Sequence, residues 1–180
     1  MKYIQPVLLI VLAILALGCA TKTPPRTVPQ VDLPRFMGDW YVQGGIFTPF
    51  EKDVYNGVET YELDDKGRIQ TTYTYNQGSL DGKEKTFTSV AFVHNKDTFA
   101  EWRIQFFWPL RFPYLVLDLA PDYSTTAVGT DDYKYLWIMS RDPHLPETKY
   151  QAIATAMGEL GFDTSKFVRV QHTPGVDTSR

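Results

Sequence analysis

The sequence predicts an all-β fold, in which eight antiparallel strands in up-and-down order close into a β-barrel and one C-terminal α-helix packs outside it. Aromatic residues make up 14% of the 180-residue chain, and aromatic side chains favour strands and large apolar interiors. Short segments of alternating polarity recur along the chain, and their connections are too short for parallel crossovers. One segment near the C terminus has the period of an amphipathic helix instead.

The N terminus has the pattern of a signal peptide. Lys2 precedes an uninterrupted apolar run, Val7 to Leu17. This run is shorter than the roughly 20 apolar residues that span a bilayer, and it has the length of a signal-peptide core. We therefore expect residues 1–18 to be cleaved, although a segment that stays in the membrane is an alternative.

The run ends at Ala16-Leu17-Gly18-Cys19, which resembles the lipobox of bacterial lipoproteins. That resemblance implies that Cys19 becomes an N-palmitoyl, S-diacylglycerol cysteine, whereas an ordinary secretory signal would leave it free. Cys19 is the only cysteine of the chain, so it has no disulfide partner within the chain in an oxidising compartment. Position 20 is Ala rather than Asp, and by the same resemblance the chain is anchored in the outer membrane, facing the periplasm.

The rest of the chain divides into a spacer, one domain and a tail. Residues 19–34 hold the expected lipidated cysteine and a segment with four prolines, which we expect to be extended and too polar to pack. Residues 35–173 form the barrel domain. Residues 174–180 are expected to be a flexible tail.

Alternating segments and turn residues predict the order of the elements. Asp64–Gly67 and Asp81-Gly82 are typical hairpin turns, and closure of eight strands removes the sheet edges and leaves room for one small ligand. Pro146 and Gly161 bound the expected helix, and a short strand is expected at 167–171. The eight predicted strands are Trp40–Phe47, Val54–Leu63, Arg68–Asn76, Glu84–His94, Phe99–Phe107, Tyr114–Ala120, Thr125–Gly129 and Tyr133–Ser140.

Three short motifs lie in order along this predicted barrel, and they resemble those of the lipocalin family. Gly38-Asp39-Trp40 matches the G-x-W motif of the first strand, Asp132-Tyr133 is assigned to the second motif, and Arg141 follows the last strand. In the family this Arg packs over the motif Trp, a contact that cation–π attraction favours. Phe36–Tyr41, Tyr135–Arg141 and Gly161-Phe162-Asp163 are similar to bacterial outer-membrane lipoprotein lipocalins related to apolipoprotein D.

The resemblance implies a lipid ligand, either a fatty acid or a lysophospholipid. Large side chains on the predicted strands are candidates for the cavity wall, with the polar head of the ligand near the mouth. Each could instead pack in the core or lie on the outer face. The candidate cavity residues are Tyr73, Tyr75, Phe92, Phe106, Tyr114 and Trp137.

Other kinds of chemistry find little support in the sequence. A net charge of −3 without a basic run argues against nucleic-acid binding. The three histidines are far apart in the sequence, so we expect no metal site. No nucleophile motif is present, and Cys19 lies outside the barrel, so we expect no catalytic residues, no cofactor and no enzyme activity. The apolar turn Phe107–Leu110 leaves open contact with a membrane or a homodimer.

These features together favour a lipid carrier or store that is anchored in the outer membrane and maintains the cell envelope under stress. The alternative is a structural envelope lipoprotein with a packed barrel and no physiological ligand. An isomerase- or epoxidase-like lipocalin enzyme is a third reading, for which the sequence shows no acid, base or nucleophile.

Overall fold

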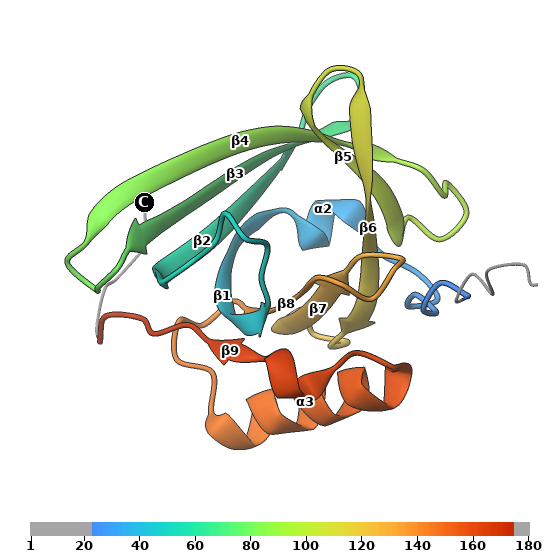
Figure 1. The fold of residues 1–180 in the computed structure, drawn as a ribbon. Helices are drawn as coiled ribbons and strands as arrows, with labels where there is room; N and C mark the ends of the chain where they lie inside the picture. The colour runs from blue at the N-terminus through green and yellow to red at the C-terminus, as the bar shows by residue number, and fades with distance from the viewer. Residues whose placement is uncertain (1–22, 175–180) are drawn as a thin grey trace, which may run out of the picture.

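One continuous antiparallel sheet closes on itself, because β1 pairs with β8 on one side and with β2 on the other (Figure 1). The structure, a computed structural model, describes residues 23–174. The predicted signal peptide and Cys19 lie outside these residues, as does the tail after Pro174. The barrel strands are β1 (Gly38–Ile46), β2 (Val54–Leu63), β3 (Arg68–Gln77), β4 (Lys83–Val93), β5 (Glu101–Phe107), β6 (Leu110–Leu119), β7 (Thr125–Gly129) and β8 (Leu136–Ser140).

The predicted eight-stranded barrel is confirmed, although several strand ends differ from those predicted. β6 begins at Leu110, four residues before the predicted start, because the β5–β6 hairpin turns tightly at Trp108-Pro109. β8 begins only at Leu136, since Tyr133 has a φ of 62° and belongs to a turn. The predicted strand at 167–171 is reduced to β9 (Val168–Arg169), which pairs with β1.

The predicted helix is present as α3 (Glu147–Leu160), and it packs outside the barrel as expected (Figure 1). Pro146 is its N-cap, and Gly161 ends it with a φ of 115°, a conformation that favours glycine. Its apolar face contacts the outer faces of the later strands in a second hydrophobic cluster. A 3-10 helix, η1 (Thr164–Lys166), follows α3 along the chain. The buried members of the cluster are Ile46, Leu115, Leu117, Ala127, Leu136, Ile138, Leu145, Tyr150, Ile153, Ala154, Met157 and Phe162.

A short helix that the sequence analysis did not predict, α2 (Leu33–Phe36), closes one end of the barrel. Phe36 is completely buried and contacts the rings of Trp40 and Trp102, with centroids 5.0 and 5.3 Å away. We call the packed rings at this end, Phe36, Trp40, Tyr61, Trp102 and Tyr114, the floor of the barrel. The opposite end, where residues 47–53 connect β1 to β2, is called the mouth.

Arg141 holds the floor in place. Its guanidinium group lies 3.8 Å from the centre of the Trp40 ring. It also donates hydrogen bonds of 2.6 to 3.0 Å to the carbonyl oxygens of Arg35, Phe36, Met37 and Asp39. The residue after the last barrel strand thus binds α2 and the start of the first strand. Gly38, with a φ of 91°, allows the chain to turn between them.

The assignment of the second motif to Asp132-Tyr133 is wrong. This pair lies in the β7–β8 connection. That connection is at the mouth, because β8 begins at Leu136, which pairs with Ile46 at the mouth end of β1. An Asp-Tyr pair that lies beside the floor is Asp122-Tyr123, in the β6–β7 connection. The Tyr123 hydroxyl accepts a hydrogen bond from the Asp32 amide at 2.8 Å, and the Arg35 guanidinium lies 3.9 Å from the Tyr123 ring centre.

The expectation that residues 20–34 are too polar to pack is also wrong for the described part of this segment. Val31 is 1% exposed, and its amide donates to the carbonyl oxygen of Thr98 at 2.8 Å. The Val28 amide donates to Val116 at 3.0 Å. Few residues of the segment are apolar, but they are spaced so that they contact the barrel. The strands and both hydrophobic clusters are built from residues 28–170, so a chain that begins at Ala20 keeps them.

Replacing Arg141 should therefore destabilise the whole barrel. Arg141→Ala removes one ring contact and leaves carbonyl groups unpaired, so we expect the free energy of unfolding to fall by about 3–5 kcal/mol. Urea denaturation of the chain from Ala20 measures this change. Lys134→Ala is the control, because its ion pair with Asp132 is largely exposed and should contribute little to stability. Equal losses in the two variants would contradict this role of Arg141.

Candidate functional site in the barrel interior

The interior of the barrel is packed near the floor and less tightly packed toward the mouth. Trp40, Tyr61 and Trp102 are completely buried, and the rings of Trp102 and Tyr114 are stacked with centroids 5.3 Å apart. Nearer the mouth, Tyr73 and Trp137 pack against the same cluster but remain partly exposed. A ligand that enters the barrel would therefore contact the mouth half and stop above the floor.

Four of the six predicted cavity residues belong to the interior cluster: Tyr73, Tyr75, Tyr114 and Trp137. Tyr114 lies in the floor, and the other three lie closer to the mouth. Tyr75 is 3% exposed, and its ring stacks on Phe87 with centroids 6.0 Å apart. The predicted residues that lie in the interior nearest the mouth are thus Tyr73, Tyr75 and Trp137.

The other two predicted cavity residues lie elsewhere. The placement of Phe92 on the cavity wall is wrong, because its neighbour Ala91 faces the interior and adjacent strand residues point to opposite faces. The ring of Phe92 is instead covered by Arg111, whose guanidinium carbon is 3.8 Å from the ring centre. Phe106 is 57% exposed at the mouth, where it packs against Phe112 with centroids 6.3 Å apart.

A carboxyl group lies among these aromatic side chains. In the strand register, Glu59 of β2 is opposite Trp40 of β1 and Tyr73 of β3, both of which belong to the interior cluster. Burial raises the pKa of Glu59 from 4.5 to about 8, a hydrogen bond from Tyr61 lowers it, and the charge of Glu51 raises it. Glu59 is therefore largely protonated and uncharged at neutral pH.

Hydroxyl groups surround this carboxyl. Tyr61 is hydrogen-bonded through its hydroxyl to Tyr114. Thr71 lies opposite Tyr61 in the register and is 3% exposed. Within residues 23–174, the buried hydroxyls of Thr71 and Tyr73 have no hydrogen-bond partner. An unpaired buried hydroxyl costs about 1–3 kcal/mol, so this part of the interior favours a ligand with a polar group.

Glu51 supplies a second carboxyl group nearer the mouth. It accepts hydrogen bonds from the Trp137 indole at 2.9 Å and from the Thr48 hydroxyl at 2.6 Å. These bonds fix the orientation of the Trp137 ring. They also bring the β1–β2 connection against β8, so Glu51 shapes the wall that a ligand would contact.

The sequence analysis did not identify Glu59 or Glu51 as interior residues. Glu59 has the same parity as the buried Tyr61 along the predicted strand Val54–Leu63, so a signal for its inward orientation was present in the sequence. A glutamate in a strand is normally assigned to the solvent side. Glu51 lies outside the strands, where alternation gives no information.

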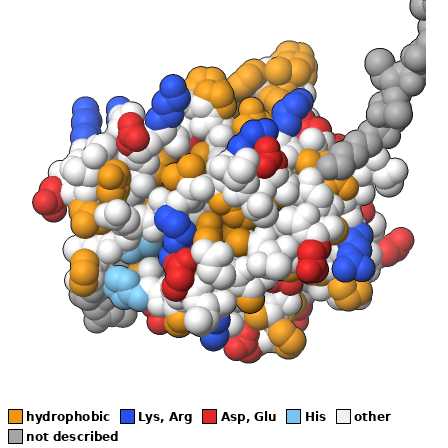
Figure 2. Space-filling model, turned by 60° about the horizontal axis from the view of Figure 1, so that its bottom comes forward, with side chains coloured by type: hydrophobic (Ala, Val, Ile, Leu, Met, Phe, Trp, Pro, Cys, Tyr) orange, Lys and Arg blue, Asp and Glu red, His pale blue; other side chains and the backbone are white. Residues whose placement is uncertain are grey.

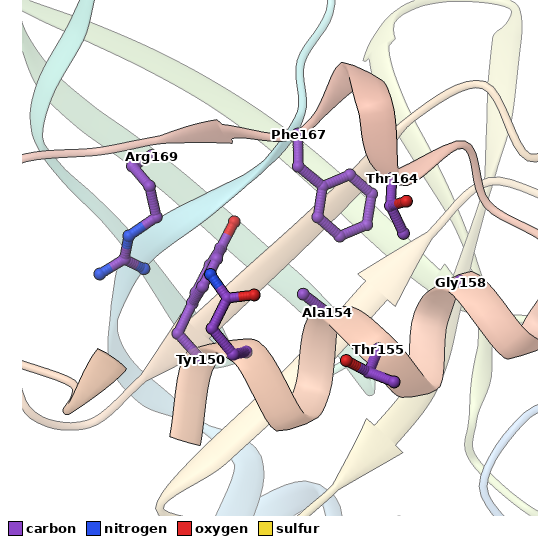
Figure 3. A pocket seen from close by; sticks show the side chains of 8 residues that line it. Tyr150, Ala154, Thr155, Gly158, Thr164, Phe167 and Arg169 are labelled. Atoms are coloured by element: carbon purple, nitrogen blue, oxygen red, sulfur yellow. The ribbon is translucent and has the colours of Figure 1, made fainter. Parts of the chain in front are cut away.

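The outer surface has a separate pocket beside α3. It has a volume of about 510 Å³ between α3, η1 and β9, and its lining includes Tyr150, Phe167 and Arg169 (Figure 3). Charged side chains of both signs are scattered over the face that carries α3 (Figure 2).

Within the described chain, no three His, Cys, Asp or Glu side chains come together in a way that could hold a metal ion. No helix of residues 23–174 has the length and apolar character needed to cross a membrane.

The family model of the lipocalin-like domain matches residues 31–172 of the chain. The chain belongs to the lipocalin family. It is 34% identical over 170 residues to the outer membrane lipoprotein Blc of Escherichia coli K12, covering 91% of this chain and 93% of that protein. The Blc protein of Citrobacter freundii is 31% identical over 179 residues, covering 97% and 99%.

A solved lipocalin structure supports the fold. Insecticyanin from the tobacco hornworm Manduca sexta superposes with a TM-score of 0.62 at 17% identity, covering 84% of this chain and 85% of that one. Lipocalins are generally binding and transport proteins for small hydrophobic ligands. The bacterial relatives are named outer membrane lipoproteins, which supports an outer-membrane location for this lipocalin.

The raised pKa of Glu59 predicts how stability changes with pH. In the unfolded chain this carboxyl ionises near 4.5, and in the folded barrel near 8. Between these values the folded state binds more protons, so its stability falls as the pH rises. Glu59→Gln lacks this carboxyl, so its stability should not fall in this way. The free energy of unfolding of the variant minus that of the wild type should therefore increase by a few kcal/mol from pH 4 to pH 9, since one pKa unit corresponds to about 1.4 kcal/mol.

Urea denaturation at a series of pH values measures the difference. Glu62→Gln is the matched control, because Glu62 lies on the same strand and is exposed. Parallel stability curves for wild type and Glu59→Gln would show that Glu59 does not ionise with a raised pKa.

Proposed function

We propose that this lipocalin binds a single-chain lipid, either a fatty acid or a lysophospholipid, in the mouth half of its barrel. It would store or carry this lipid at the outer membrane and so help to maintain the envelope under stress. The observation that supports the proposal best is the set of interior aromatic rings that remain partly exposed above a packed floor. Burying an acyl chain against them is favourable by about 0.8 kcal/mol per methylene group.

The charges near the mouth are consistent with a polar head in that position. Lys85 lies on β4 opposite Tyr75, and it has the same parity as the inward-facing Ala91. An ammonium group there would attract the carboxylate of a fatty acid or the phosphate of a lysophospholipid. Exposed apolar side chains at the mouth, Phe106 and Phe112, would contact the first methylene groups.

We further propose that the protein is attached to the outer membrane through a lipid on Cys19 and faces the periplasm. The names of the bacterial relatives and the lipobox-like sequence support this anchor. The described chain begins at Thr23, whose carbonyl oxygen accepts a hydrogen bond from Tyr133 at 2.9 Å. Tyr133 lies in a connection at the mouth, so a short anchor would bring the mouth near the membrane surface.

A second candidate is a structural envelope lipoprotein without a ligand. The tightly packed floor favours it, because those rings leave the lower half of the interior filled. The two candidates differ in whether the mouth half accepts an acyl chain, and a binding experiment can distinguish them.

A fluorescent fatty acid should bind the chain from Ala20 saturably, and unlabelled fatty acid or lysophospholipid should displace it. Tyr75→Ala removes an interior ring and should weaken binding about tenfold, or about 1.4 kcal/mol. Phe92→Ala is the matched control, because this ring lies on the outer face, and its affinity should be unchanged. Absence of saturable binding, together with no lipid in native mass spectra, would favour the structural candidate.

The anchor can be tested separately by labelling cells with radioactive palmitate. The wild-type protein should carry the label and fractionate with outer membranes. Cys19→Ser should lose the label, because the oxygen of serine does not replace the thiol that receives diacylglycerol. Equal labelling of the two proteins would mean that Cys19 is not the site of lipidation.

A further inference from the structure

The most unusual group inside the barrel is the carboxyl of Glu59. Buried carboxyl groups are normally paired with a cation or hydrogen-bonded to several donors. The groups that influence Glu59 are Tyr61, through a hydrogen bond, and Glu51, through its negative charge. Neither Tyr61 nor Glu51 is a cation, so neither of them neutralises the charge of Glu59 when it ionises.

Negative charge on these carboxyl groups also raises the pKa values of the tyrosine hydroxyls near Glu59. Burial raises the pKa of Tyr73 well above its usual range, and the charges of Glu51 and Glu59 raise it further. Burial and the charge of Glu59 act in the same direction on Tyr114 in the floor. The negative charge of Glu51, and that of Glu59 once it ionises, therefore favour a positive ligand group next to Glu59 over a negative one.

Two hydroxyls that lack partners lie next to Glu59 on the interior face. Tyr73 is directly opposite Glu59 in the strand register, and Thr71 is the diagonal neighbour, at a typical separation of about 7–8 Å between backbones. The Tyr73 hydroxyl reaches over β2, where it lies 3.1 Å from the position that a Cβ of Gly57 would occupy. Along this stretch of the interior wall the Glu59 position therefore lies between Thr71, on the floor side, and the Tyr73 hydroxyl, on the mouth side.

A primary ammonium ion matches this arrangement. It has three N–H donors, and the site offers three acceptors: the carboxylate of Glu59, the hydroxyl oxygen of Thr71 and the hydroxyl oxygen of Tyr73. The interior between these groups and the mouth is lined by aromatic rings, of which Phe87 is 46% and Phe112 is 42% exposed. Such a wall fits an alkyl chain that runs from the amine toward the mouth.

We propose that Glu59, Thr71 and Tyr73 form a subsite for the ammonium group of a single-chain amphiphilic amine. The inference rests on the proposed function, since it requires that the barrel accept one alkyl chain. It adds a ligand class and an orientation in which the polar group lies deep in the barrel. A fatty acid, whose carboxylate gains no cationic partner at this subsite, would bind the other way round, with its carboxylate near Lys85.

The charged and titratable groups around the subsite define its dependence on pH. Glu51 faces Glu59 from the β1–β2 connection, Tyr61 from the same strand, and Tyr73 from β3. Tyr114 contacts Tyr61 from β6, and Lys85 lies nearer the mouth on β4. Of these, Glu59 has a pKa near neutrality, about 8. Binding of an ammonium ion at pH 7 should therefore release close to one proton from Glu59.

Isothermal titration of the chain from Ala20 with decylamine, decanol and decanoate tests the subsite, because these probes differ only in the polar group. We expect decylamine to bind about tenfold more tightly than decanol, and decanoate to bind most weakly. Titration in phosphate and in Tris buffer should show release of about one proton with decylamine and none with decanol.

Variants assign the preference to the named residues. Glu59→Gln should lower the affinity for decylamine at least about tenfold, change that for decanol less than about threefold, and abolish proton release. Tyr73→Phe removes only an unpartnered hydroxyl, so it should fold normally and should weaken decylamine binding more than decanol binding. Glu62→Gln, on the exposed face of the same strand, should behave as wild type.

The outcomes separate the subsite from the proposed function. If decanol or decanoate binds saturably but decylamine has no advantage, or keeps its advantage in Glu59→Gln, the ammonium subsite is wrong and lipid binding stands. If decanol binds most tightly, the site recognises a neutral hydroxyl and the amine proposal is overturned. If none of the three probes binds, both the subsite and the proposed function are wrong.

Discussion

The contact between Arg141 and Trp40 is the interaction on which the rest of the barrel depends. One guanidinium group stacks on the ring and hydrogen-bonds to four carbonyl oxygens of α2 and the start of β1. It therefore joins the end of the last barrel strand to the segment that enters the first. The sheet itself closes through the backbone pairing of β1 with β8, and Arg141 links this closure to that of the lower end.

This closure decides where a ligand can lie. The rings of the floor are packed to near-complete burial, so a ligand inside the barrel would lie between the level of Glu59 and the mouth. A polar group at the base of an apolar wall is a selective arrangement, because an unsuitable ligand group leaves buried hydrogen-bonding atoms without partners. Glu51, which orients Trp137, adds negative charge to the same wall.

The sequence predicted the fold because alternation and turn residues are local properties. It also indicated Trp40 and Arg141, two residues that the structure brings together. The Asp-Tyr motif failed because the chain has two such pairs 10 residues apart, and only the pairing of β7 and β8 shows that Asp122-Tyr123 lies near the floor. The prediction that Phe92 lines the cavity was wrong because the sequence of β4 contains no residue whose orientation was known, so its inward-facing positions could not be assigned. Glu59 was missed although it has the same parity as Tyr61, because a glutamate in a strand is normally assigned to the solvent side.

The central claim is that the ligand lies inside the barrel, above the floor. Anomalous diffraction from crystals grown with a terminally brominated fatty acid locates the chain directly. The account predicts a bromine peak in the interior, within contact distance of Tyr73, Tyr75 or Trp137. A peak only in the outer pocket between α3 and β9, with the interior unoccupied, would contradict it.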